Sequence, residues 1–140
     1  MNKYLYEKIS AYVPYDEREA EDKEVILEFI KNNEDVLTRN NKIAHMTTSA
    51  WITNKDRTKL LMIYHNIYDS WAWVGGHADG DEDLMYVAKK EVEEEILRIK
   101  EDENSGVKWV PFDEVENYST EEKMKPIYRR LTEKLKTLNI

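Results

Sequence analysis

The 140-residue sequence contains no cysteine. Disulfide bonds, thiolate zinc sites and cysteine nucleophiles are therefore excluded. Glycine and proline are scarce, and no apolar run approaches the roughly 20 residues of a membrane-spanning helix. The first residues also lack a continuous apolar segment, so we expect neither a signal peptide nor a membrane anchor, and we expect a cytoplasmic protein.

Positive charge is also in short supply. The chain has 29 acidic residues against 21 lysines and arginines, which gives a net charge of −8. Such a chain repels nucleic-acid backbones and anionic membranes, and because no basic patch offsets this charge we expect it to bind neither. The length predicts a single domain, residues 1–140, with an N-terminal arm and helix over residues 1–40.

The acidic residues include one group that ordinary folding does not explain. A glycine-rich turn at Gly75-Gly76 leads into a predicted helix, on which Glu91, Glu94 and Glu95 share one face at α-helical spacing. Like charges so spaced repel by roughly 0.2–0.5 kcal/mol per pair, and a divalent cation would remove this repulsion. Mg²⁺ or Mn²⁺ is expected because it prefers carboxylate, carbonyl and water oxygens. The alternative is a solvated acidic face that binds nothing.

The stretch over residues 76–98 resembles the signature of the Nudix hydrolase family. That signature reads glycine, five residues, glutamate, seven residues, arginine, glutamate, aliphatic, any residue, two glutamates, any residue, glycine, aliphatic. The chain matches it at Gly76, Glu82, Glu91, Val92, Glu94 and Glu95. It departs from it at Lys90, which replaces the arginine, and at Leu97 and Arg98, which stand where glycine and an aliphatic residue belong.

The resemblance implies a fold, a reaction and a set of site residues. The fold would be an α/β/α sandwich with a mixed sheet, and the reaction would be Mg²⁺-dependent hydrolysis of a diphosphate linkage in a nucleoside diphosphate derivative. The implied metal ligands are Glu91, Glu95, Glu94 and Gly76, the last through its carbonyl. Catalytic roles fall on Glu94, on Glu82 as an auxiliary carboxylate, and on Lys90, which braces the glutamates more weakly than arginine would. A homodimer is expected because dimers are common among relatives.

The general base and the substrate contacts have more than one interpretation. One of the helix glutamates could serve as the base. His77, which follows Gly76, is another candidate because histidine titrates near neutral pH; the alternative for His77 is a loop histidine that only hydrogen-bonds the turn. Tyr68 and Trp71 are candidates to stack on a base or ring, against ordinary core packing. The aromatic-rich stretch 4–14 is either an ordered arm packed on the domain or a lip that faces the substrate.

Residue patterns predict the remaining elements. A capping box at Asp16 and Glu19 starts a helix that ends near Asn32-Asn33. Strands are predicted at 43–53, 60–64, 71–74 and 107–111, with His45 and His65 as ordinary strand residues, and a turn at 54–57. A helical turn at 112–115 precedes a capping box at Ser119 and Glu122 and a helix from Pro126. The core stripe of that last helix is predicted as Ile127, Leu131, Leu135 and Leu138.

The chain is short after the glutamate helix. Only about a dozen residues separate Glu95 from Trp109, where the Nudix fold normally places further strands. Either a segment between Glu95 and Val107 is missing, or the sheet is shortened and exposes an edge. Two alternatives to a working hydrolase follow: a Nudix-fold protein that binds a nucleotide or a partner without turnover, and an acidic structural domain.

Overall fold

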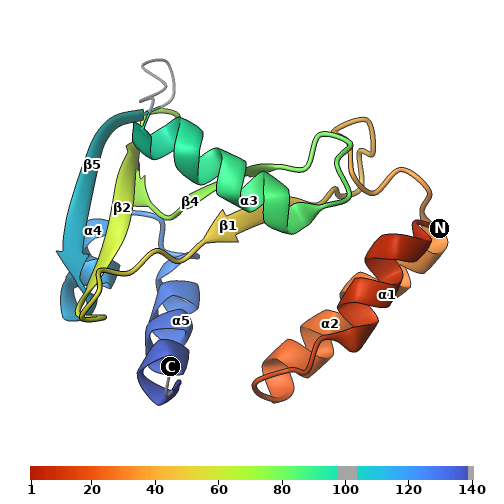
Figure 1. Ribbon diagram of the computed structural model, residues 1–140, viewed down its shortest axis with the longest axis horizontal. Coiled ribbons are helices and arrows are strands. Elements are labelled where there is room, and N and C mark those ends of the chain that lie inside the picture. The colour runs from red at the N-terminus through yellow and green to blue at the C-terminus, as the bar shows by residue number, and fades with distance from the viewer. Residues whose placement is uncertain (98–103, 139–140) are drawn as a thin grey trace. The chain divides into compact units, whose positions relative to one another are not determined.

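The computed structural model describes residues 1–97 and 104–138, which form a mixed α/β structure with five α-helices and two small sheets (Figure 1). The predicted α/β class is confirmed. The chain divides into two compact units: Met1–Thr48 with His77–Val87, and Ser49–Gly76 with Ala88–Ile140. Within the described part of the chain, no helix has both the length and the apolar character needed to cross a membrane.

In the first unit, helix α2 (Glu17–Asn32) occupies the stretch where the sequence predicts it. Asp16 Oδ1 accepts a hydrogen bond of 2.9 Å from the Glu19 N–H, which satisfies one of the free donors at the helix start. The Glu19 carboxylate turns back and accepts a bond of 2.8 Å from the Tyr15 N–H. The helix ends at Asn32, so both predicted boundaries are confirmed.

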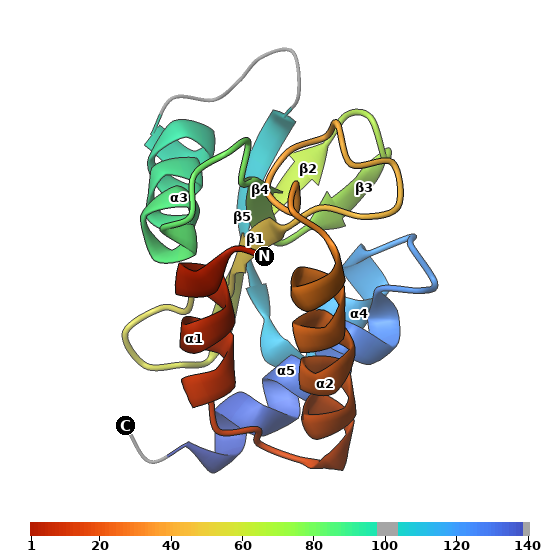
Figure 2. The same ribbon diagram turned by 90° about the vertical axis from the view of Figure 1, so that its right-hand side faces the viewer.

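The aromatic-rich stretch of the first unit is helix α1 (Lys3–Ala11). Asn2 caps this helix by accepting a hydrogen bond of 2.9 Å from the Leu5 N–H, and Leu5 itself is buried. The predicted arm is therefore ordered, but it is helical. The two helices lie side by side (Figures 1 and 2). The core of the unit consists of Leu5, Ile30 and Val36, with Ile9, Phe29, Met46 and Leu84 among the residues packed against them.

The second unit is organised around β2 (Lys59–His65), the middle strand of a three-stranded antiparallel sheet. Its neighbours are β3 (Ser70–Ala72) and β5 (Asn104–Pro111). The four residues Leu60–Ile63 are all buried, which confirms the prediction of a strand covered on both faces. In the described residues β5 is an edge strand of this sheet. The predicted interruption after Glu95 falls partly on residues 98–103, which lie outside the described residues.

Tyr128 lies at the centre of the second unit's core. The core residues come from β2, β5, α4 (Val115–Tyr118) and α5 (Lys125–Thr137) and are Leu60, Met62, Val110, Val115 and Tyr128. The rings of Trp51 and Trp73 each lie with their centroids 5.5 Å from that of Tyr128. The Trp73 N–H donates to the Tyr128 hydroxyl at 3.3 Å. Both helices follow from the end of β5, through a short 3₁₀ turn (Phe112–Glu114) (Figure 2).

Two predicted strands have different boundaries in the structure. The stretch predicted over 43–53 is a strand only at β1 (Thr47–Ala50), because the N–H groups of Ile43 and Ala44 bond to the Asn41 side chain instead. The stretch predicted over 71–74 is interrupted at Trp73, and β4 (Val74–His77) contains both glycines that the sequence predicts as a turn. β1 and β4 form the second, two-stranded sheet. The turn comes later, at Asp79 and Gly80, whose φ angles are 47° and 95°.

The C-terminal helix also differs from its prediction. Pro126 lies in the first turn of α5 as expected, but no helix begins at Ser119, whose Oγ accepts a bond from the Glu121 N–H. The predicted core stripe is wrong: Ile127 is 41% exposed, and α5 buries Tyr128 and Thr132 instead. The apolar repeat correctly predicts a helix. Which face of that helix is buried is decided by Tyr128, whose hydroxyl accepts a hydrogen bond from the backbone N–H of Trp73.

Replacing Tyr128 tests this orientation of α5. We expect Tyr128→Ala to lower the free energy of unfolding by about 3–5 kcal/mol, because it leaves a large cavity, and Tyr128→Phe by about 1 kcal/mol, for one hydrogen bond. Burial raises the pKa of Tyr128 from 10.0 to about 12, so this tyrosine stabilises the fold below pH 10 and the benefit is lost as pH rises toward 12.

The measurement is urea denaturation followed by far-UV circular dichroism. Ile127→Ala, one residue earlier on the same helix, is the control and should change stability by less than about 0.5 kcal/mol. A larger loss from Ile127→Ala than from Tyr128→Phe would restore the stripe predicted from sequence.

Candidate functional site

The glutamate helix changes its geometry within the Nudix-like segment. Helix α3 (Leu84–Val92) continues directly into a π-helical turn over Glu93–Leu97. The prediction of one α-helical face therefore holds only as far as Val92, because a π-turn bonds over five residues and advances less per residue. Such turns are rare and are frequently found at functional sites. Glu94 and Glu95 both lie in it.

Gly76 and Glu91 are brought into direct contact. A Cβ atom placed on Gly76 would lie 2.7 Å from each carboxylate oxygen of Glu91, closer than non-bonded atoms approach. Only glycine leaves room for the carboxylate against the strand. The two residues come from β4 and α3, and both are positions at which the chain matches the Nudix signature.

The other carboxylates of the helix differ in their surroundings. Glu95 is only 2% exposed, and a carboxylate so far from water has to be compensated by donors or positive charge. Lys90 Nζ lies 3.8 Å from Glu94 Oε1, one helical turn further on, with the lysine half-exposed. This is the bracing contact expected of Lys90, and a pair so exposed contributes only about 0.3–0.5 kcal/mol.

Two predicted site residues lie in the first unit. Glu82 precedes α3, and one of its carboxylate oxygens accepts a hydrogen bond of 3.3 Å from Asn2 Nδ2. His77 ends β4, and its Nδ1 lies 2.9 Å from Nε2 of His45. His45, predicted as a strand residue, lies outside the strands, and His77 lies in a strand and not in the predicted loop; its role as a base stays a prediction. His65, by contrast, is a strand residue as predicted.

An ion pair holds the turn that follows His77. Arg39 donates from Nε and from one terminal nitrogen to the two carboxylate oxygens of Asp79, at 3.0 Å each. This two-pronged bond, helped by the nearby His77 and His45, holds the pKa of Asp79 below its usual range. The sequence gives no local signal for either the His45–His77 contact or this ion pair, because the partners are far apart in the chain.

The aromatic candidates have different environments. Trp71 packs edge-on against Tyr64 and Tyr118, with ring centroids 5.5 and 6.2 Å away, and against the core, which confirms its core-packing interpretation. Tyr68 is 59% exposed, and its ring lies 4.4 Å from that of His65. Only Tyr68 is therefore open to a ligand.

The candidate ligands of the site have the donor atoms that Mg²⁺ prefers, but their side chains do not converge in the described part of the structure. Gly76, Glu91, Glu94 and Glu95 would offer oxygen ligands only, the type that Mg²⁺ prefers. Yet over residues 1–97 and 104–138 no three histidine, aspartate or glutamate side chains converge closely enough to hold a metal ion.

Two comparisons with known proteins gave no match. No protein-family model matches the chain, and no curated protein matches it. The Nudix resemblance therefore depends on the residues of the segment itself and on the contact between two of them.

The substitution Gly76→Ala is expected to disturb the Gly76–Glu91 contact without unfolding the protein, and so to test the role of this contact in metal binding. The new methyl group would displace the Glu91 carboxylate, which is the end of a flexible side chain, so the fold should lose little stability. Affinity for Mn²⁺, measured by isothermal titration calorimetry, should fall by roughly 10–100-fold, as for other disturbed ligand shells. Gly75→Ala is the matched control, because its side chain would point to the opposite face of β4. Equal affinities in the two variants would contradict the assignment.

Arg39→Gln is expected to raise the pKa of Asp79 toward its usual value. Since the pKa of Asp79 is lowered in the folded protein, the ion pair stabilises the fold above the usual aspartate range and the benefit is lost as the pH falls through the lowered pKa. The variant should lose this part of its pH dependence. The pKa is measured by NMR of the side-chain carboxyl carbon, with Lys42→Gln as a control for the lost charge. An unchanged Asp79 pKa would show that Arg39 does not set it.

Proposed function

We propose that the protein is a Mg²⁺-dependent hydrolase of the Nudix type, which cleaves a diphosphate linkage in a nucleoside diphosphate derivative. The observation that carries the proposal is the contact between Gly76 and Glu91. These two residues stand at matching positions of the signature, well apart in sequence. If the match to the signature were only a chance similarity of composition, the Gly76 backbone and the Glu91 carboxylate would not be expected to lie in contact.

The order of elements supports the same proposal. A strand, β4, carries the glycine, a tight turn at Asp79-Gly80 follows, and helix α3 together with the π-turn that continues it carries the glutamates. In this proposal the mixed α/β structure is a Nudix-type α/β/α sandwich whose sheet is shortened after the glutamate helix. The proposed occupants are a small diphosphate substrate and Mg²⁺ or Mn²⁺, with a homodimer as the proposed assembly and no nucleic acid or membrane as partner.

The residues of the site divide the work of hydrolysis among them. Bound Mg²⁺ would neutralise the diphosphate oxygens and hold the attacking water in line. Glu91 and Glu95 are the proposed direct ligands, and the Gly76 backbone adds a carbonyl oxygen. Glu94, whose Oε1 lies 3.8 Å from Lys90 Nζ, is the proposed base that would accept a proton from water.

A second candidate function is binding without turnover. It is favoured by the end of the signature, where Leu97 and Arg98 replace glycine and an aliphatic residue, and by the π-turn that carries Glu94 and Glu95. In such a protein the site would still bind Mg²⁺ and hold a nucleotide or a partner, but it would not catalyse hydrolysis.

The experiment is a screen of nucleoside diphosphate derivatives. The readout is release of phosphate or of a nucleoside monophosphate. We expect turnover that requires Mg²⁺ and falls by roughly 100-fold or more in Glu94→Gln and in Glu91→Gln, as for loss of one transition-state contact. Glu93→Gln is the matched control, because Glu93 lies in the same π-turn but is exposed and stands at an unconstrained position of the signature.

The outcomes separate the three interpretations. Turnover that survives Glu94→Gln unchanged would show that the assigned site is wrong. An increase in melting temperature with millimolar Mg²⁺ but no turnover would favour binding without catalysis. No effect of Mg²⁺ on melting and no turnover would favour an acidic structural domain.

A further inference from the structure

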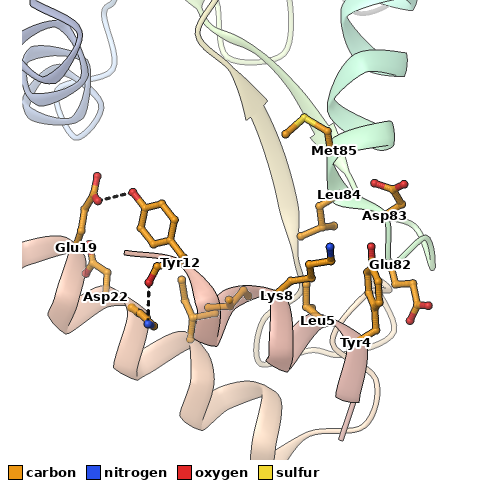
Figure 3. Close-up of a pocket in the computed structure, with 13 residues that line it drawn as sticks. Tyr4, Leu5, Lys8, Tyr12, Glu19, Asp22, Glu82, Asp83, Leu84 and Met85 are labelled. Carbon is orange, nitrogen blue, oxygen red and sulfur yellow. Dashed lines mark hydrogen bonds between the residues drawn. The ribbon is translucent and has the colours of Figure 1, made fainter. Parts of the chain in front are cut away.

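A groove lies in the first unit, outside the residues assigned to hydrolysis except for Glu82. It has a volume of about 890 Å³ and is lined by one face of α1, one face of α2 and the segment 82–85 (Figure 3). The lining residues of each helix are one, three or four positions apart in sequence, so they share one face of that helix. The groove therefore follows the line along which α1 and α2 lie side by side.

The floor of the groove is apolar and its walls expose large apolar side chains. Leu5 is buried at the base, and Figure 3 shows Leu84 and Met85 above it. Met85 is 67% exposed, and Ile26 and Tyr4 are also exposed. Apolar side chains that line a concave surface of this size are typical of a binding site.

The rim of the groove is acidic. Four carboxylates line it against two lysines: Glu19, Asp22, Glu82 and Asp83, with Lys8 and Lys23. Lys23 donates from Nζ to the carbonyl oxygens of Ser10 and Tyr12, at 2.7 and 2.8 Å, so its charge holds the end of α1. The carboxylates occur toward both ends of the groove in Figure 3, with the apolar residues between them. The rim therefore favours a positively charged ligand.

The shape of the groove favours a helix over a smaller cation. The nine residues of α1 span roughly 13 Å at 1.5 Å per residue, which is more than two helical turns. An apolar strip of this length between two helices matches the apolar face of a third helix, and the acidic rim matches basic residues on either side of that face. A small organic cation would meet the charge but leave most of the apolar strip uncovered.

We propose that this groove binds an amphipathic helix of a partner protein whose apolar face is flanked by lysine or arginine. Apolar residues at helical spacing would lie on the floor between Leu5 and Met85. The basic flanks would lie against the carboxylates of the rim. This inference does not depend on the proposed hydrolase activity, since the groove and the Gly76–Glu91 contact involve different residues.

The test uses a fluorescently labelled synthetic peptide of about 14 residues, with leucine at helical spacing and lysine on both flanks, roughly 20 Å long as a helix. A second peptide carries glutamate in place of every lysine. We expect the lysine peptide to bind the full chain with micromolar affinity by fluorescence anisotropy, at least roughly tenfold tighter than the glutamate peptide. The lysine peptide should also shift the methyl NMR signals of Leu5, Ile26 and Met85.

Two pairs of variants locate the binding. Met85→Gln should weaken it by roughly tenfold, whereas Val25→Gln should not, because Val25 is equally exposed, at 69%, but lies outside the groove. Asp22→Lys should likewise weaken it more than Glu24→Lys, which makes a similar charge change on an exposed residue outside the groove. Circular dichroism of each variant verifies that the helices are retained.

Several results would overturn the proposal. One is equal binding of the lysine and glutamate peptides, and another is no binding at millimolar peptide. A third is equal weakening by the members of either variant pair, which would show that the peptide binds the acidic surface in general. Methyl shifts that occur only outside the groove would reject it even if a variant failed to fold.

Discussion

The contact between the Gly76 backbone and the Glu91 carboxylate is the constraint on which the candidate site depends. It links two facts: the Glu91 carboxylate is turned toward β4, and it can lie there only because position 76 has no side chain. A charged group so close to a strand backbone has its position set by packing as well as by electrostatics. The helix can then change from α to π just beyond Val92 without releasing the first carboxylate of the cluster.

Each unit has its own core, and the two cores are built differently. The first depends on helix caps and a few aliphatic residues around Leu5 and Ile30. The second depends on the buried middle of β2, Leu60–Ile63, and on an aromatic cluster around Tyr128. The chain passes from one unit to the other at three points: within β1, after Gly76 and within α3. Gly76, Glu91, Glu94 and Glu95 therefore belong to the second unit, and Glu82 belongs to the first.

The sequence predicts elements well where one local signal decides them. The apolar run from Leu60 identifies β2, and the Asp16 cap identifies α2, because burial and capping leave a clear pattern in neighbouring residues. It fails where distant partners decide. The face of α5 depends on the site that Tyr128 finds among Trp51 and Trp73, and the His45–His77 contact joins residues 32 positions apart. The signature contains both Gly76 and Glu91, which the structure brings into contact, but a pattern of charges carries no apolar period and could not predict the π-turn.

The distribution of tryptophan makes the two units optically distinct. All four tryptophans, Trp51, Trp71, Trp73 and Trp109, belong to the second unit. Trp51 and Trp73 also meet edge to face, with ring centroids 6.3 Å apart, close enough for their electronic transitions to couple. Indole emission, excited at wavelengths that tyrosine does not absorb, therefore reports on the second unit alone, while the far-ultraviolet dichroism of the helices reports on both units. Comparing the two signals during unfolding of one unlabelled sample gives the order in which the units lose structure.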